Sequence, residues 1–286
     1  MTIVISFINL KGGVGKTTTT VAVAEMMAGV FQRKVLVIDL DPQTNATLML
    51  IGEQKWEELN DTKCTIAQLF VDATDPDHRK FNLSQTLQRR VSNIKDVETL
   101  DLLPSSLDLI NVQDRLASIP SGRFYATSPI EILRRGIRSI INNYDYILID
   151  CPPNLGIITL NGLRISQGYI IPTIPDILST YSIPLIIKTI NEFSDVIAEP
   201  IEPFGIVISK YQADMILHDR TIRDFSRYSK DAQVFATKIP QNHQIAEAAE
   251  FIERNQFMTL RQKWERTEQF DSYLSLTKEI MKRVIE

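Results

Sequence analysis

The chain has 286 residues, 44% of them hydrophobic, which is enough to build a large buried core. Its net charge of −4 excludes a protein that binds nucleic acid over its whole surface, so any DNA-binding surface must be a local patch. The two cysteines form no CxxC pair, and no window of membrane-spanning length is free of charge and proline, so we expect a soluble, cytoplasmic protein.

The first predicted element is an apolar strand over residues 3–8, and a glycine-rich turn follows it before a helical pattern over 20–27. The turn reads Lys11-Gly12-Gly13-Val14-Gly15-Lys16-Thr17-Thr18. Its glycines let backbone N–H groups point at phosphate oxygens, and the start of the helix adds further unpaired N–H groups. In this context Lys16 can reach the β- and γ-phosphates, and the Thr17 hydroxyl can ligate Mg²⁺. The turn therefore predicts a nucleotide phosphate site.

The second predicted strand, over 35–38, leads directly to two acidic residues, Asp39 and Asp41. The alternation of a strand points both side chains toward the same edge. Two carboxylates that converge repel each other unless a cation lies near, and Mg²⁺ bound to ATP is the natural candidate. The alternative is that Asp39 caps the next helix while Asp41 is solvated.

Residues 52–95 form the least regular stretch, with many charges and turn residues, and we interpret them as a helical and loop decoration on a single domain over 1–286. Beyond them, Ser105 and Ser106 precede an apolar pattern that is typical of a capped helix start. A further helix is expected at the C-terminus, over 267–286.

A strand over 146–149 ends at Asp150, which can accept a hydrogen bond from a magnesium-bound water. Further apolar runs follow at 169–171, 205–208 and 233–236. Continuous apolar strands are buried on both faces, which predicts an α/β fold with a doubly wound, mostly parallel sheet flanked by helices on both faces. Ligands bind at the carboxyl ends of such strands, so the glycine-rich turn and the acidic residues should converge there.

Three segments together resemble the ParA/MinD superfamily of deviant Walker A ATPases, and they are most like its ParA/Soj-type partition ATPases. These segments are residues 11–18 with their additional Lys11, residues 39–43, and residues 150–156. The resemblance implies a P-loop NTPase fold, with ATP and Mg²⁺ as cofactors. It also implies that Lys11 crosses a dimer interface to the nucleotide of the other subunit. One departure is Thr44, where the family more often has glycine.

The resemblance also assigns roles to individual residues. It implies catalytic roles for Lys11, Lys16 and Asp41, of which Asp41 positions the attacking water. It places the nucleotide against residues 11–18, with Pro240 beside the base. The metal would be held by three side chains, those of Thr17, Asp39 and Asp150.

Members of this family hydrolyse ATP slowly, and a ParB-like or adaptor protein stimulates them. Their ATP-bound homodimers bind DNA nonspecifically and position a plasmid, a chromosome or another cargo, so the resemblance implies a nucleoid-associated protein. Here a predicted helix carries four basic residues at spacings of three and four, which places them on one face: Arg220, Arg223, Arg227 and Lys230. The alternative is a solvated helix with local ion pairs.

Three other functions remain open at this point. One is a carboxysome-positioning relative of ParA. Another is a MinD-like ATPase whose C-terminal helix meets lipid, although the mixed charges over 275–286 favour a helix that docks on the core. The third is a metabolic transferase on the same scaffold, such as a biotin-pathway ligase, which would need a pocket for a substrate carboxylate.

Overall fold

The computed structural model describes residues 1–75, 77, 79–95, 97–117, 128–228, 232–241, 251, 259–265 and 270–285. Within these residues seven strands form one sheet in the order β3-β2-β4-β1-β5-β6-β7, and every neighbouring pair is parallel. The strands are β1 (Ile3–Phe7), β2 (Val35–Asp39), β3 (Leu100–Leu103), β4 (Tyr146–Asp150), β5 (Gly168–Thr173), β6 (Glu202–Tyr211) and β7 (Val234–Pro240).

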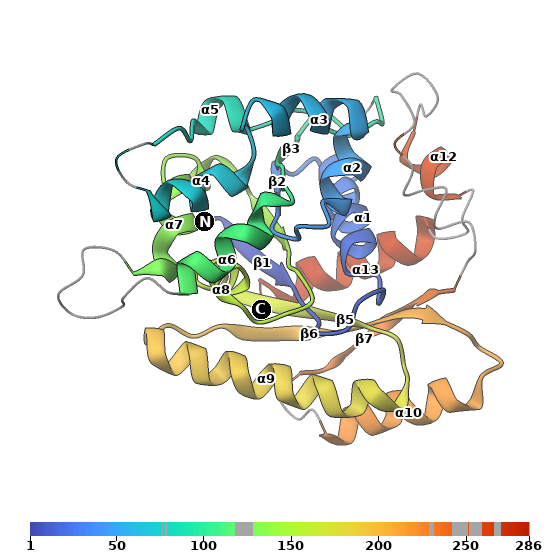
Figure 1. The fold of residues 1–286 in the computed structure, drawn as a ribbon. Helices are drawn as coiled ribbons and strands as arrows, with labels where there is room; N and C mark the ends of the chain where they lie inside the picture. Colours follow the sequence, from blue (N-terminus) through green and yellow to red (C-terminus); the bar gives the residue numbers. More distant parts are fainter. Residues whose placement is uncertain are drawn as a thin grey trace.

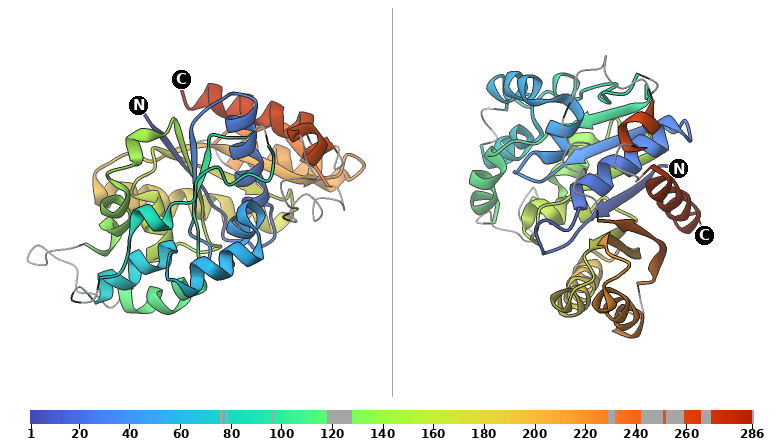
Figure 2. Two further views of the ribbon diagram at one scale, coloured as in Figure 1. Left: turned by 90° about the horizontal axis from the view of Figure 1, so that it is seen from above. Right: turned by 90° about the vertical axis from the view of Figure 1, so that its right-hand side faces the viewer.

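The central strands are buried along their length, since every residue of β2, β4 and β5 is buried. Helices cover both faces of the sheet (Figures 1 and 2). The predicted fold class is therefore confirmed.

The helices of the described part are α1 (Lys16–Gly29), α2 (Asn45–Ile51), α3 (Glu53–Asp61), α4 (Ile66–Thr74), α5 (Leu83–Thr86), α6 (Asp108–Ala117), α7 (Ile132–Ile137), α8 (Ile157–Leu163), α9 (Ile177–Ile197), α10 (Ile216–Tyr228), α12 (Leu260–Glu265) and α13 (Phe270–Arg283), with short 3₁₀ turns η2 (Pro129–Glu131) and η3 (Ile141–Asn143).

Two apolar clusters fill the space between the sheet and its helices. On one face, side chains of α1, α2, α12 and α13 pack against the sheet. On the other face, the packing side chains come from α4, α6, α7, α8, α9 and α10. The stretch over 52–95 contributes to both clusters, because Leu59 of α3 belongs to the first and Phe70 of α4 to the second. This stretch therefore wraps around the β3 edge of the sheet, at the top of Figure 1.

The strand β3 is the one strand of the described sheet that the sequence analysis did not predict. It has only four residues, and Asp101 interrupts its apolar run. That carboxylate is nonetheless buried, because it accepts hydrogen bonds from the Tyr144 hydroxyl at 2.8 Å and from the backbone N–H of Arg90 at 3.1 Å. The strand that pairs with β2 was therefore missed because a charged residue interrupts its short apolar run.

The C-terminal helix α13 packs on the core, as its mixed charge pattern indicated. Tyr273, Leu276 and Ile280 are buried in the cluster that includes α1. None of the helices described here combines the length and the apolar character that a membrane span requires.

Candidate functional site

The glycine-rich turn follows β1 and is held by neighbouring strands. Gly13 and Gly15 have φ angles of 72° and 80°, in the left-handed region that suits glycine. The Ser209 hydroxyl, from β6, lies 2.7 Å from the carbonyl oxygen of Val14. The amide of Asn9 donates to the carbonyl of Pro172 at 2.8 Å. The turn is therefore held in place at the carboxyl end of β1.

The start of α1 places Lys16 at the centre of this turn. The side chain is buried, and its ammonium lies 3.5 Å from the carbonyl oxygen of Lys11. A Cβ atom added at Gly12 or Gly13 would meet nothing within 4 Å, so the turn opens onto unfilled space. Because the helix N-terminus also presents unpaired N–H groups, the turn forms an anion cradle with a lysine inside it.

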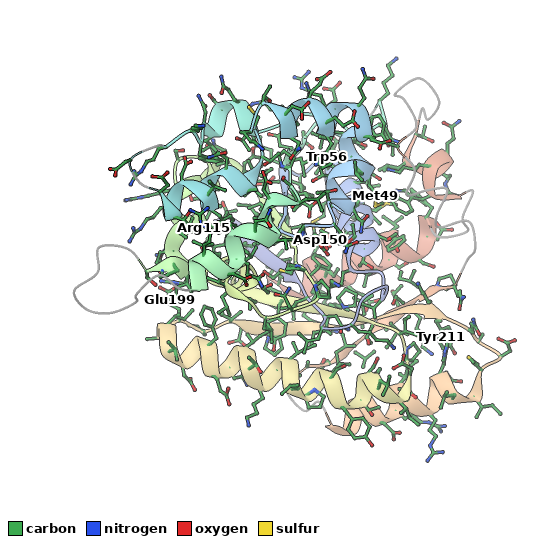
Figure 3. The ribbon with its side chains drawn as sticks, viewed as in Figure 1. Met49, Trp56, Arg115, Asp150, Glu199 and Tyr211 are labelled. Carbon is green, nitrogen blue, oxygen red and sulfur yellow. The ribbon has the colours of Figure 1, made fainter. Side chains whose placement is uncertain are left out.

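Asp39 and Asp150 lie side by side, since they are paired residues at the ends of the adjacent strands β2 and β4. Asp150 lies in the interior of the molecule, where it is labelled in Figure 3. Both of its carboxylate oxygens are buried, and neither has a hydrogen-bond partner within the described part of the chain. Burial raises the pKa of Asp150 well above its usual range, and the charge of Asp39 raises it further, against the lowering effect of the nearby Thr17 and Lys16.

Asp39 is held more firmly than its neighbour. It accepts hydrogen bonds from the backbone N–H and the hydroxyl of Thr47 in the first turn of α2, at 2.9 and 2.7 Å. Burial raises the pKa of Asp39 to about 7, although the bonds from Thr47 oppose this. Asp39 thus satisfies one backbone N–H in the first turn of α2 from its position beside Asp150, although Thr44 is the N-cap residue of that helix.

Asp41 is not solvated, because only 5% of the residue is exposed. It accepts a hydrogen bond from the backbone N–H of Gln43 at 2.9 Å, and burial raises its pKa while Lys16 lowers it. Three residues further on, Thr44 has a φ of 57°. A left-handed conformation costs a residue with a Cβ atom about 1 kcal/mol, which explains why a glycine suits this turn.

The acidic pair fits a magnesium ion that is bound together with phosphate. Asp150 is an orphaned buried carboxylate beside a second buried carboxylate, and a divalent cation would neutralise both. Among the described residues no group of three or more His, Cys, Asp or Glu side chains could hold a metal by itself. Mg²⁺ commonly takes one or two carboxylates and completes its shell with water and phosphate oxygens. Thr17, Asp39 and Asp150 would supply the protein's part of that shell.

Lys11 forms an ion pair with Asp176, which precedes α9. Asp176 also caps α9, because it accepts hydrogen bonds from the backbone N–H and the hydroxyl of Ser179, both at 2.9 Å. Nothing in the sequence indicates that Asp176 pairs with Lys11. The recognisable pattern at Asp176 is an aspartate three residues before a serine, which is typical of a helix cap and carries no information about a residue 165 positions away.

The remaining predicted site residues lie toward the other edge of the sheet. Pro240 ends β7, and it is paired with Tyr211 of β6, which Figure 3 labels. On α10, Arg220 and Arg223 are exposed. The side chain of Arg227 and all of Lys230 lie outside the described residues. Asp219 of the same helix contacts the Tyr211 hydroxyl at 2.7 Å and the Lys238 ammonium at 3.5 Å.

Comparison with known proteins places this arrangement in a family. The profile of the AAA domain family matches residues 2–202. The sporulation initiation inhibitor protein Soj of Bacillus subtilis is 30% identical over 247 residues, which cover 86% of this chain and 87% of that protein. The chromosome partitioning protein ParA of Myxococcus xanthus is 26% identical over 280 residues, which cover 98% and 88% of the two chains.

The fold and the glycine-rich turn define a P-loop ATPase. Within that class, the chain belongs to the ParA/Soj family of partition ATPases. The resemblance to ParA/Soj-type ATPases that the sequence motifs indicated is therefore confirmed. As a member of this family, the chain is an ATPase.

Solved structures agree on the fold. Apo McdA from Cyanothece has a TM-score of 0.75 at 18% identity, over 98% of this chain and 100% of that one. A putative plasmid partition protein from Borrelia burgdorferi bound to AMPPNP has a TM-score of 0.67 at 23% identity, over 100% and 99%. Cobyrinic acid a,c-diamide synthase from Mycobacterium smegmatis with bound ADP and magnesium has a TM-score of 0.67 at 25% identity, over 87% and 91%.

Proposed function

We propose that this protein binds and hydrolyses ATP with Mg²⁺, and that ATP joins two copies into a dimer that binds DNA without sequence preference. One observation carries the proposal: an anion cradle that holds the buried Lys16 lies at the same edge of the sheet as a pair of buried carboxylates. Homologous structures with AMPPNP, or with ADP and magnesium, support these ligands.

Phosphoryl transfer needs positioning and charge neutralisation more than covalent chemistry. Lys16 and the N–H groups at the start of α1 would hold the β- and γ-phosphates. Magnesium, when bound, would neutralise charge on the phosphate oxygens. Asp41 lies at the same edge with its carboxylate held by Gln43, so it would orient the attacking water. The motifs supply no arginine finger, so hydrolysis should be slow until a ParB-like partner acts.

The case for a dimer comes from Lys11. Two lysines within one short loop repel each other unless a polyanion lies between them. Lys16 is buried within the cradle, while 35% of the Lys11 side chain is exposed beside α9. A triphosphate bound in a second copy would give Lys11 a second anionic partner. ATP would then act as the switch that joins the copies, and hydrolysis would separate them.

The case for DNA rests on a local patch, because the net charge of −4 gives no general attraction. Arg220 and Arg223 are exposed on α10, at a spacing that puts them on one face. The acidic neighbour Asp219 pairs with Lys238, and the Tyr211 hydroxyl and the charges of Lys238 and Arg223 lower the pKa of Asp219, so this carboxylate partly neutralises the patch. Contacts to phosphates alone would give sequence-independent binding that weakens steeply with salt.

Retention of DNA on a filter or column tests this proposal directly. We expect retention with ATP and Mg²⁺ but not with ADP or without nucleotide, and we expect Arg223→Ala to weaken it about tenfold, as the loss of a phosphate contact does. Arg135→Ala is the matched control, since Arg135 is an exposed arginine on α7 rather than α10. Equal retention with ADP and ATP would contradict the switch.

The relatives support one class of cargo over the other. Soj of Treponema pallidum is a chromosome-partitioning ATPase, 29% identical over 85% of this chain. We therefore favour a DNA cargo and a nucleoid-associated location in the cytoplasm. The likeness to McdA, at 18% identity, concerns the fold alone and does not favour an organelle cargo.

A MinD-like function is disfavoured by α13. Its apolar residues Tyr273, Leu276 and Ile280 are buried against the core and are not available to lipid. If the protein cosedimented with anionic lipid vesicles in the presence of ATP and retained no DNA, that result would support a MinD-like function instead.

A further inference from the structure

The contact between Lys11 and Asp176 joins the phosphate cradle to the start of α9. Both side chains are about one-third exposed, at 35% and 30%, so the pair lies at the surface of a single copy. The backbone around it is fixed on both sides. Asn9 accepts the backbone N–H of Lys11 at 2.9 Å and donates to the carbonyl of Pro172 at 2.8 Å. These bonds fix the backbone from which the Lys11 side chain reaches Asp176.

Asp176 uses its two oxygens for two different purposes. Oδ1 accepts the backbone N–H and the hydroxyl of Ser179 and so caps α9, whereas Oδ2 meets the Lys11 ammonium. Burial by itself would raise the pKa of Asp176, but the hydrogen bonds from Lys11 and Ser179 outweigh it and lower the pKa. The carboxylate is therefore ionised at neutral pH and competes for Lys11 as an anion.

We propose that Asp176 is a positioning residue that holds Lys11 within its own chain, so that a nucleotide on a second copy must displace Asp176 to gain Lys11. This inference rests on the proposed ATP-dependent dimer. The phosphates of the second copy and the carboxylate of Asp176 are alternative partners for one ammonium group. Asp176 consequently sets the ATP concentration at which two copies join, without touching the nucleotide itself.

Asp176→Asn is the informative variant, because asparagine caps helices as well as aspartate does but carries no charge. The loss of a partly exposed ion pair corresponds to about a two- to fivefold change in an equilibrium constant. We expect the ATP concentration for half-maximal dimerisation, measured by light scattering, to fall by that factor. The affinity for ADP, measured by calorimetry, should stay unchanged, because ADP binding to a single copy does not require Lys11 to leave.

Ser179→Ala is the matched control, since it removes one bond of the cap and leaves the charge of Asp176 in place. It should leave the half-maximal ATP concentration unchanged. An Asp176→Asn variant that needs as much ATP as the wild type, or more, would overturn the proposal. So would an equal shift in Ser179→Ala, because the effect would then come from the cap.

A second readout separates this inference from the proposed function. In nucleotide-free protein the rate at which Lys11 reacts with an acylating reagent, followed by mass spectrometry, should rise about two- to fivefold in Asp176→Asn, because the ion pair that shields it is lost. An unchanged rate would show that Asp176 does not hold Lys11. If the reactivity rises but wild-type protein never dimerises with ATP, the dimer of the proposed function is wrong and the competition fails with it.

Discussion

Asp150 has no hydrogen-bond partner in the described part of the chain, although both of its oxygens are buried. The neighbouring Asp39 has three hydrogen bonds, from the backbone and hydroxyl of Thr47 and the backbone of Asp41. Two carboxylates that meet in this way destabilise the nucleotide-free protein when both are ionised. A cation bound between the two carboxylates would remove this repulsion. Such an unfavourable pair is therefore expected at a binding site and not in an ordinary hydrophobic core.

A pH-dependent difference in stability follows for Asp150→Asn. The folded-state pKa of Asp150 is raised above its unfolded value, so this group makes the wild type lose stability as the pH rises above about 4. The asparagine variant lacks this contribution and keeps only those of Asp39 and Asp41, whose pKa values are also raised. In EDTA, urea unfolding at pH 8 should show the variant to be more stable than the wild type by an amount on the order of 1 kcal/mol. At pH 5 the gap should be smaller. A gap that does not change with pH would contradict this account of Asp150.

Individual site residues were predictable to the extent that local sequence placed them. Residues 11–18, Asp39 and Asp150 follow apolar strands, and parallel strands bring their carboxyl ends together. Asp176 and Ser209 were not identified in their roles. Their contacts with Lys11 and Val14 join segments 165 and 195 positions apart, and no periodicity encodes such pairs.

At the scale of elements, α1 and α12 are joined by a buried polar cluster. Glu25 lies in the otherwise apolar middle of α1, and both Glu25 and Lys263 are fully buried. Lys263 donates to Glu25 at 2.8 Å and to Asn93 at 3.1 Å, and the indole N–H of Trp264 donates to Glu25 at 2.9 Å. The only sequence signal for this cluster was a single acidic residue in an apolar helix pattern, and its partner is 238 positions away.

Removal of one member of this cluster should be costly. Lys263→Ala leaves the carboxylate of Glu25 buried without its cation, so we expect a loss of about 3–5 kcal/mol in the free energy of unfolding, measured by denaturant titration. Arg261→Ala in the same helix breaks an exposed pair with Asp271, at 51% and 80% exposure, and should cost about 1 kcal/mol or less. Similar losses in the two variants would show that the buried cluster has no special role.

For the whole molecule, the sheet order explains why one edge collects the chemistry. The strands β2, β4, β1 and β5 are consecutive neighbours, so the segments that follow them meet at one place. Those segments carry the acidic pair, the glycine-rich turn and Asp176. The class of fold was predictable because continuous apolar strands alternate with helices. The short strand β3 and the path of 52–95 around the sheet edge were not, since they depend on packing between distant segments.

The central claim is that ATP joins two copies through Lys11, and light scattering of the protein with ATP and Mg²⁺, with ADP and without nucleotide tests it most directly. We expect the mass of a dimer with ATP alone, and the mass of a single chain for Lys11→Ala even when ATP binding is saturated. Lys188→Ala, which removes an exposed lysine in the middle of α9, should behave as the wild type. A wild type that stays a single chain with ATP, or a Lys11→Ala variant that dimerises as readily, would contradict the account.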